Sequence, residues 1–143
     1  SFLLFDSNEE AEQTHLSRIL IFASYDMLFK ASLARELFAD GTYRVVPRGF
    51  ATLYTIHSVV EGVPYPIFFC LTQNEREETF MRVLNVIKAH LRQFDANGVV
   101  HTDCQKSAIN AFRRLWLQSE GLSFPHQSSS VEVRLERQPC NGL

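Results

Sequence analysis

Two aspartates are the residues of this sequence whose type and surroundings could support metal-dependent chemistry. Asp40 precedes Gly41 and a stretch of β-forming residues, and Asp103 follows a short apolar segment, residues 99–102. If neighbouring strands carry them, two carboxylates about 4 Å apart repel by roughly 4 kcal/mol at a surface-like dielectric. A divalent cation offsets this repulsion, and Mg²⁺ prefers oxygen ligands. Such a pair suits phosphodiester chemistry.

Simpler interpretations stand beside this one. Asp before Gly is a common turn residue, and Asp directly ahead of a helix is an ordinary N-cap. His57 lies among apolar residues and is either a hydrogen-bonded strand histidine or a substrate contact, and His101 leaves the same alternatives open. Lys106, Arg113 and Arg114 could contact phosphate, although an exposed helix face explains them equally.

Length and charge limit the possible classes. A chain of 143 residues fits one domain. Its net charge of -2 gives no bulk attraction to nucleic acid. Residues 1–40 contain seven acidic and three basic residues, so we expect any phosphate contact in the later part.

The absence of certain signals narrows these classes further. Cys70, Cys104 and Cys140 are too widely spaced for a zinc knuckle, and we expect three thiols. No apolar run approaches the roughly 18 residues that span a bilayer, which predicts an intracellular protein without a membrane partner. Because the chain begins with Ser1 rather than Met, we expect either a domain excised from a longer polypeptide or an incomplete gene model.

The N-terminal part predicts a loop, a strand and a helix. Residues 6–17 are polar, and residues 18–23 form a short apolar run. Ser24 or Asp26 can cap a helix whose apolar spacing continues to Phe38.

The next part predicts a β-meander. Its strands are residues 43–46, which end at Pro47, residues 50–60 and residues 65–72, with a turn at residues 61–62. Pro64 and Pro66 indicate that the third strand begins at a sheet edge or only after Pro66.

Two helices and one strand complete the pattern. Asn74 and Glu77 have capping-box spacing ahead of a helix that runs to Phe94. A strand at residues 99–102 and a helix at residues 105–116 follow. We therefore predict an α/β fold (α+β, mixed sheet) with three antiparallel strands, a crossover helix, a strand parallel to the first, and a helix.

This reading divides the chain into three parts. Residues 1–36 lead into the domain, and residues 37–117 form its core. Residues 118–143 contain a serine run and two prolines, and we expect a divergent, poorly ordered tail.

Four blocks of sequence, in order, resemble those of the Mutator-like (MULE) transposase domain. They are FADGTYRVVPR (residues 38–48), LYTIH (53–57), LTQNEREET (71–79) and TDCQKSAINAF (102–112). The segment from Phe2 to Leu28 is similar to the lead-in of animal members, so the resemblance covers about residues 2–114.

The resemblance implies an RNase H-like fold with a DDE/D catalytic set, in which Asp40 matches the first acid and Asp103 the second. It further implies Mg²⁺ or Mn²⁺ as the cofactor, transposon ends and target DNA as partners, and the nucleus as the location. His57 and Lys106 are the substrate-binding candidates. A homo-oligomer is left open.

The chain departs from the family after the helix predicted at residues 105–116. Residues 121–126 keep a Gly, a Phe and a His of the next family block, but Leu122 stands where the family has Cys. Glu120, Glu132 and Glu136 do not match the third acid. We therefore expect an inactive fragment of a DNA strand-cleaving and strand-joining enzyme. The alternatives are a relict or domesticated DNA- or protein-interaction domain, and an unrelated single-metal α+β enzyme.

Overall fold

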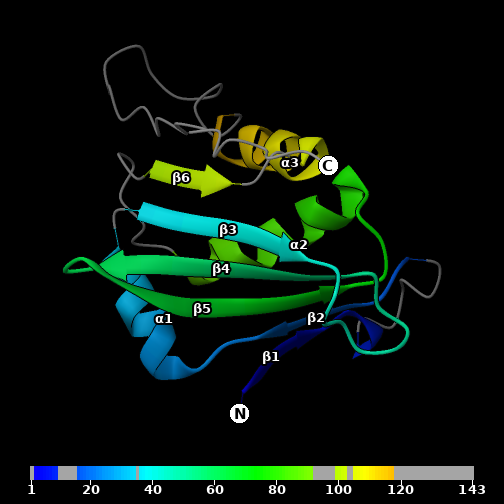
Figure 1. Cartoon of the computed structure of the whole chain (residues 1–143), viewed down its shortest axis with the longest axis horizontal. Coiled ribbons are helices and arrows are strands. Elements are labelled where there is room, and N and C mark those ends of the chain that lie inside the picture. The colour runs from blue at the N-terminus through cyan, green and yellow to red at the C-terminus, as the bar shows by residue number, and fades with distance from the viewer. Residues whose placement is uncertain (1, 10–15, 35, 92–98, 103–104, 118–143) are drawn as a thin grey trace.

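A computed structural model of the chain describes residues 2–9, 16–34, 36–91, 99–102 and 105–117. These residues form a six-stranded mixed sheet in the order β1-β2-β5-β4-β3-β6, together with three α-helices (Figure 1). The predicted α/β class with a mixed sheet is confirmed. The predicted tail, residues 118–143, lies outside the described residues.

Three consecutive strands stand in the middle of the chain, with a helix before them and another after them. The strands are β1 (Leu3–Asp6), β2 (Ile19–Phe22), β3 (Glu36–Thr42), β4 (Thr52–Val60), β5 (Val63–Thr72) and β6 (Val99–Thr102). The helices are α1 (Tyr25–Ser32), α2 (Glu77–His90) and α3 (Lys106–Leu117), and one 3-10 turn, η1 (Ser7–Glu9), follows β1. None of the helices in the described ranges is long and apolar enough to cross a membrane.

The centre of the sheet has the predicted topology. Strands β3, β4 and β5 form an antiparallel meander, and β6 pairs in parallel with β3 after the crossover through α2. The β4–β5 hairpin closes through Glu61 (φ 52°) and Gly62 (φ 78°), which connect the paired residues Val60 and Val63. Two successive positive φ angles match the right-handed twist of the flanking strands, so the register of the hairpin is set locally.

The first strand of the meander lies earlier than predicted. We expected residues 43–46, but β3 is Glu36–Thr42, and the chain turns away from the sheet after Thr42. Leu37 and Ala39 are buried, whereas Tyr43 and Val45 are more than half exposed. A strand forms where alternate side chains reach a core, so burial outweighs the β propensity of Val45 and Val46.

The end of the first predicted helix and the start of the second also differ from the structure. The predicted first helix continued to Phe38, but α1 ends at Ser32, because the later apolar residues belong to β3. Ser24 does cap α1, accepting a hydrogen bond from the Met27 amide at 3.3 Å. The Asn74–Glu77 capping box is wrong, because α2 begins at Glu77 after the N-cap Arg76. Phe94 lies outside the described residues.

The N-terminal segment adds two strands to the same sheet. Strand β2 is the predicted one, and it pairs with β5 over Phe69–Thr72. Strand β1 was not predicted: the loop was expected to begin at Asp6, which is instead the last residue of β1. The prolines of β5 lie before this stretch, where only β4 pairs with the strand in the described chain. The expectation that the third strand begins at an edge is therefore confirmed.

One core cluster joins all three helices to one face of the sheet. Figure 1 shows α2 behind β3 and β4. Tyr54 on β4 and Phe80 on α2 are both fully buried, with ring centroids 5.1 Å apart in an edge-to-face arrangement. Ala31 of α1 and Phe112 of α3 belong to the same cluster. Burial of these side chains supplies the main stabilisation of the fold.

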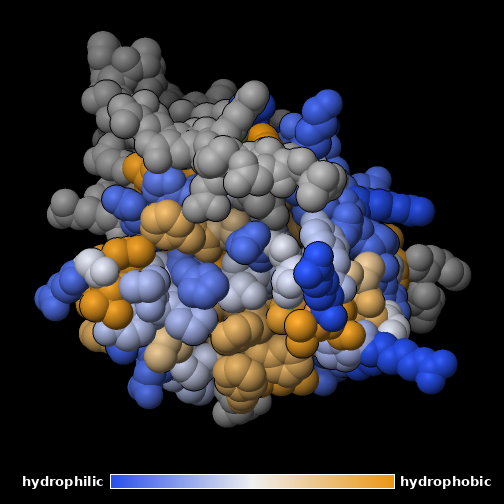
Figure 2. Space-filling view, in the orientation of Figure 1, coloured by the Kyte–Doolittle hydropathy of each residue, from blue (hydrophilic) through white to orange (hydrophobic). Residues whose placement is uncertain are grey.

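The opposite face of the sheet carries half-buried side chains. On this face Phe2 packs on Phe22 of β2 and on Phe69 of β5. The Phe2 ring centroid lies 5.6 Å from that of Phe22 and 6.4 Å from that of Phe69. Figure 2, in the same orientation, shows hydrophobic residues gathered over β1 and β2. Polar residues occupy much of the rest of this view, so the apolar area is local.

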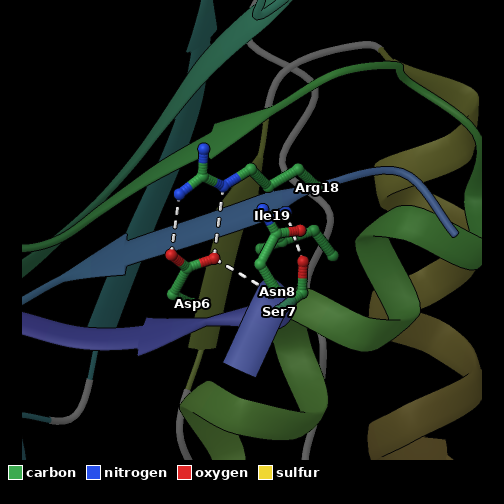
Figure 3. Close-up of polar contacts among 5 residues, drawn as sticks. All are labelled: Asp6, Ser7, Asn8, Arg18 and Ile19. Atoms are coloured by element: carbon green, nitrogen blue, oxygen red, sulfur yellow. Dashed lines mark hydrogen bonds and ion pairs between the residues drawn. The ribbon is translucent and has the colours of Figure 1, made fainter. Parts of the chain in front are cut away.

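An ion pair links the end of β1 to the residue before β2. Arg18 donates to both carboxylate oxygens of Asp6, from Nη2 at 2.8 Å and from Nε at 3.2 Å (Figure 3). The Asn8 amide donates to the same carboxylate, and the Ile19 amide donates to the Ser7 hydroxyl at 2.9 Å. Two parallel hydrogen bonds between a guanidinium and a carboxylate fix their relative orientation.

Replacing Asp6 by Asn is expected to lower the melting temperature at neutral pH and to have a smaller effect in acid. The hydrogen bonds from Arg18 and then from the Asn8 amide lower the pKa of Asp6 in the folded protein. The stabilisation is therefore present above the unfolded pKa of about 4 and is lost as the pH falls through the lower folded value. Thermal unfolding of the wild type and Asp6→Asn across this range measures the difference. Arg18→Met should remove the same stabilisation, and a difference that stays constant with pH would contradict the assignment.

Candidate functional site

Asp40 lies inside a strand rather than in a turn. It is the fifth residue of β3, its side chain is exposed, and it pairs across the sheet with Thr55 on β4. Alternation along β3 places it on the same face as Glu36 and Phe38, opposite the face that packs into the core. Asp40 therefore presents an accessible carboxylate near the C-terminal end of β3.

Asp103 lies outside the described residues, as does Cys104, but the chain on both sides of them is described. Thr102 ends β6 and pairs with Ala39, the residue directly before Asp40. The Thr102 hydroxyl lies 3.2 Å from that of Tyr54 in the core. The described chain resumes at Gln105, next to the start of α3. The parallel pairing thus places side by side the two residues that directly precede the predicted aspartates.

The two histidines of the prediction lie on the same face of the sheet as Asp40. The His101 ring stacks on Phe38 with centroids 4.3 Å apart, and its Nε2 lies 3.3 Å from Glu36 Oε2. The interpretation of His101 as a hydrogen-bonded strand histidine is therefore confirmed. His57 is half-buried opposite Phe38 and makes no hydrogen bond through its ring to another residue in the described ranges. Its role as a substrate contact stays a prediction.

The basic residues of α3 fall into two groups. Lys106, the first residue of the helix, and Arg113 are both exposed, and both remain candidate phosphate contacts. Arg114 instead pairs with Glu77 of α2, with 3.0 Å between Nε and Oε1. Structural pairing of the two helices accounts for Arg114.

A polar network that sequence reasoning missed lies beside the ends of β3 and β6. The Tyr43 hydroxyl donates to Gln105 Oε1 at 3.1 Å, and Gln105 Nε2 donates to Glu75 Oε2 at 3.0 Å. Thr52, at the start of β4, donates its hydroxyl to Glu75 Oε1 at 2.9 Å. Strands β3, β5 and β6 run in the same direction, so their C-terminal ends lie at the same end of the sheet. In the sequence Glu75 follows β5, as Asp103 follows β6. This position shortly after a strand could have identified Glu75 from the sequence.

Of the two predicted metal ligands, only Asp40 lies within the described chain. Asp40 supplies carboxylate oxygens of the kind that Mg²⁺ prefers. The residues that the structure describes include no group of three or more His, Cys, Asp or Glu side chains able to hold a metal. Asp103, which the sequence predicts as the second ligand, lies outside these residues.

Comparison of the chain with protein-family models, with curated proteins and with solved structures gave no significant match.

Proposed function

We propose that the chain is a transposase-derived RNase H-like domain of the MULE kind, in which Asp40 and Asp103 jointly hold a divalent cation. The observation that carries this proposal is the parallel pairing of β3 and β6 in the register that sets Ala39 opposite Thr102. An antiparallel meander followed by a helix and a strand parallel to the first is also the order that the resemblance implies.

Strand alternation supports the convergence of the two carboxylates. His101 and Phe38 share one face of the sheet, as their stacked rings require. Asp40 lies two residues after Phe38, and Asp103 is two residues after His101 in the sequence. We propose that this shared spacing brings Asp103 to the face of the sheet that carries Asp40.

The proposed chemistry is cleavage and joining of DNA strands by the complete parent enzyme. A bound Mg²⁺ or Mn²⁺ would activate the attacking oxygen and stabilise the leaving one. His57 and Lys106 are proposed to contact the DNA, and the nucleus follows as the location. Because the net charge of -2 provides little general attraction to phosphate, binding should require the cation or further protein.

The test of the cation site is a Mn²⁺ titration of the chain and of Asp40→Asn. The wild type should bind Mn²⁺, with paramagnetic broadening of backbone amide signals centred on residues 39–41. Loss of one ligand should raise the dissociation constant by at least about tenfold, since even residues that only support a ligand change affinity by 10–100-fold. Asp26→Asn, the same change at an exposed position of α1, is the matched control and should bind as the wild type does. Equal affinity in Asp40→Asn would exclude the site.

Catalysis separates the proposed function from its alternative. With two matched acids and no third, we propose that the 143-residue chain binds the cation without cutting transposon-end DNA. Robust cleavage in Mg²⁺ or Mn²⁺ that Asp40→Ala abolishes would contradict this inactivity. DNA binding that persists without metal, and in a variant with both aspartates replaced by Ala, would favour a relict or domesticated interaction domain.

A further inference from the structure

We propose that Glu75 and Gln105 form a positioning pair that holds the start of α3 against the ends of the meander and thereby sets the geometry of the cation site. The role in cation binding rests on the function proposed above. Four places in the chain meet at this contact: Glu75 follows β5, Gln105 precedes α3, Tyr43 follows β3, and Thr52 begins β4. The two residues are 30 positions apart in sequence.

The chemistry of the contact fixes its direction. A carboxylate only accepts hydrogen bonds, so the amide nitrogen of Gln105 must face Glu75, which leaves the amide oxygen for the Tyr43 hydroxyl. The other oxygen of Glu75 accepts from Thr52, whose side chain is fully buried. Glu75 is thus anchored to the rigid start of β4, and hydrogen bonds to its charged group are stronger than neutral ones.

The position of the pair explains why it should matter for the site. Gln105 is two residues after Asp103, and Tyr43 is three residues after Asp40. The hydrogen bonds of Gln105 to Tyr43 and Glu75 therefore connect the segment that follows Asp40 with the segment that follows Asp103. A contact that restrains these segments limits how far the chain after β3 can move away from the start of α3, and outer contacts of this kind tune metal affinity.

The experiment compares two amide truncations, one at the residue before α3 and one within α3. Gln105→Ala removes the contact with Glu75, and Asn110→Ala removes an equivalent bond in which the Asn110 amide donates to Glu77 at 3.2 Å, away from the site. Gln105→Ala should raise the dissociation constant for Mn²⁺ about tenfold. It should also speed amide hydrogen exchange in the first turn of α3 in metal-free protein. Asn110→Ala should leave the Mn²⁺ constant unchanged. Equal Mn²⁺ constants for Gln105→Ala and the wild type would overturn the proposal.

A reciprocal swap tests the contact rather than the individual residues. In Glu75→Gln combined with Gln105→Glu, the amide donates to the carboxylate in the reverse direction, and Tyr43 and Thr52 keep acceptors. The swap should restore the Mn²⁺ constant to within about threefold of the wild type, whereas Gln105→Glu alone should weaken the contact by placing two carboxylates together. A swap that fails to restore affinity would show that the charge of Glu75 itself is required, which overturns a positioning role.

Mn²⁺ binding and hydrogen exchange distinguish a failure of the proposed function from a failure of the positioning pair. If the wild type does not bind Mn²⁺, the proposed function fails, and the positioning pair is then judged by hydrogen exchange alone. Faster exchange at the start of α3 in Gln105→Ala, restored by the swap, supports the pair without any metal. Unchanged exchange overturns it.

Discussion

Phe80→Ala is expected to lower the free energy of unfolding by about 3–5 kcal/mol, the range typical of deleting a buried aromatic ring. The Phe80 side chain is fully buried between α2 and the central strands, and its ring packs edge-to-face on Tyr54. Truncation removes this contact and leaves a cavity that the close-packed surroundings fill only in part. The cavity lies directly under β4, the strand that pairs with β3, so the site residues should lose order together with the core.

Chemical denaturation of the wild type and the variant measures this effect. Phe29→Ala is the matched control, because the Phe29 side chain is 68% exposed on α1. We expect that control to change the free energy of unfolding by less than about 0.5 kcal/mol. Similar losses in the two variants would mean that Phe80 does not lie in a packed core.

The second large effect concerns the reactivity of Cys70. Its side chain is fully buried on β5, and burial raises the pKa of the Cys70 thiol far above its ordinary value. The thiolate is the reactive form, so a raised pKa and a lack of access both slow alkylation. At pH 8, iodoacetamide should label Cys70 at least about 10³ times more slowly in the native protein than in denaturant, because labelling requires unfolding.

Residue-resolved mass spectrometry can follow Cys70 separately from Cys104 and Cys140. Phe80→Ala should accelerate native labelling, because destabilisation increases the open population. Labelling of native Cys70 at the denatured rate would show that β5 is not covered by the helices. The two predictions therefore test the same core by independent measurements.

Regular local patterns were predicted well from the sequence. The apolar spacing around Phe80 and Ile87 indicated α2, and that around Ala108 and Phe112 indicated α3. The turn at Glu61 and Gly62 was recognised because hairpin turns with positive φ favour Gly. These features depend on residues close together in the chain, so their signals survive without knowledge of the tertiary structure.

The errors lie where tertiary contacts override local preference. Leu37 fits the helical spacing that begins at Met27, yet it belongs to β3, because its side chain is buried in the sheet beside Val100. Val45 favours a strand, but it is 77% exposed after the chain has left the sheet. The Asn74 side chain accepts from the Thr79 hydroxyl at 2.6 Å, where a capping role for α2 was expected. In each case the alternatives have similar local energies, and burial or a distant partner decides between them.

The sequence by itself determined the α/β class, the order of the central elements, and the choice of Asp40 and Asp103 as candidate ligands. Only the tertiary structure decided that Asp40 lies within a strand, that Ala39 pairs with Thr102, and that Glu75 contacts Gln105. The physical reason is register. A shift of one residue would move every side chain of a strand to the other face, and it is the burial of the whole inner face, made by residues distant in sequence, that selects one pairing.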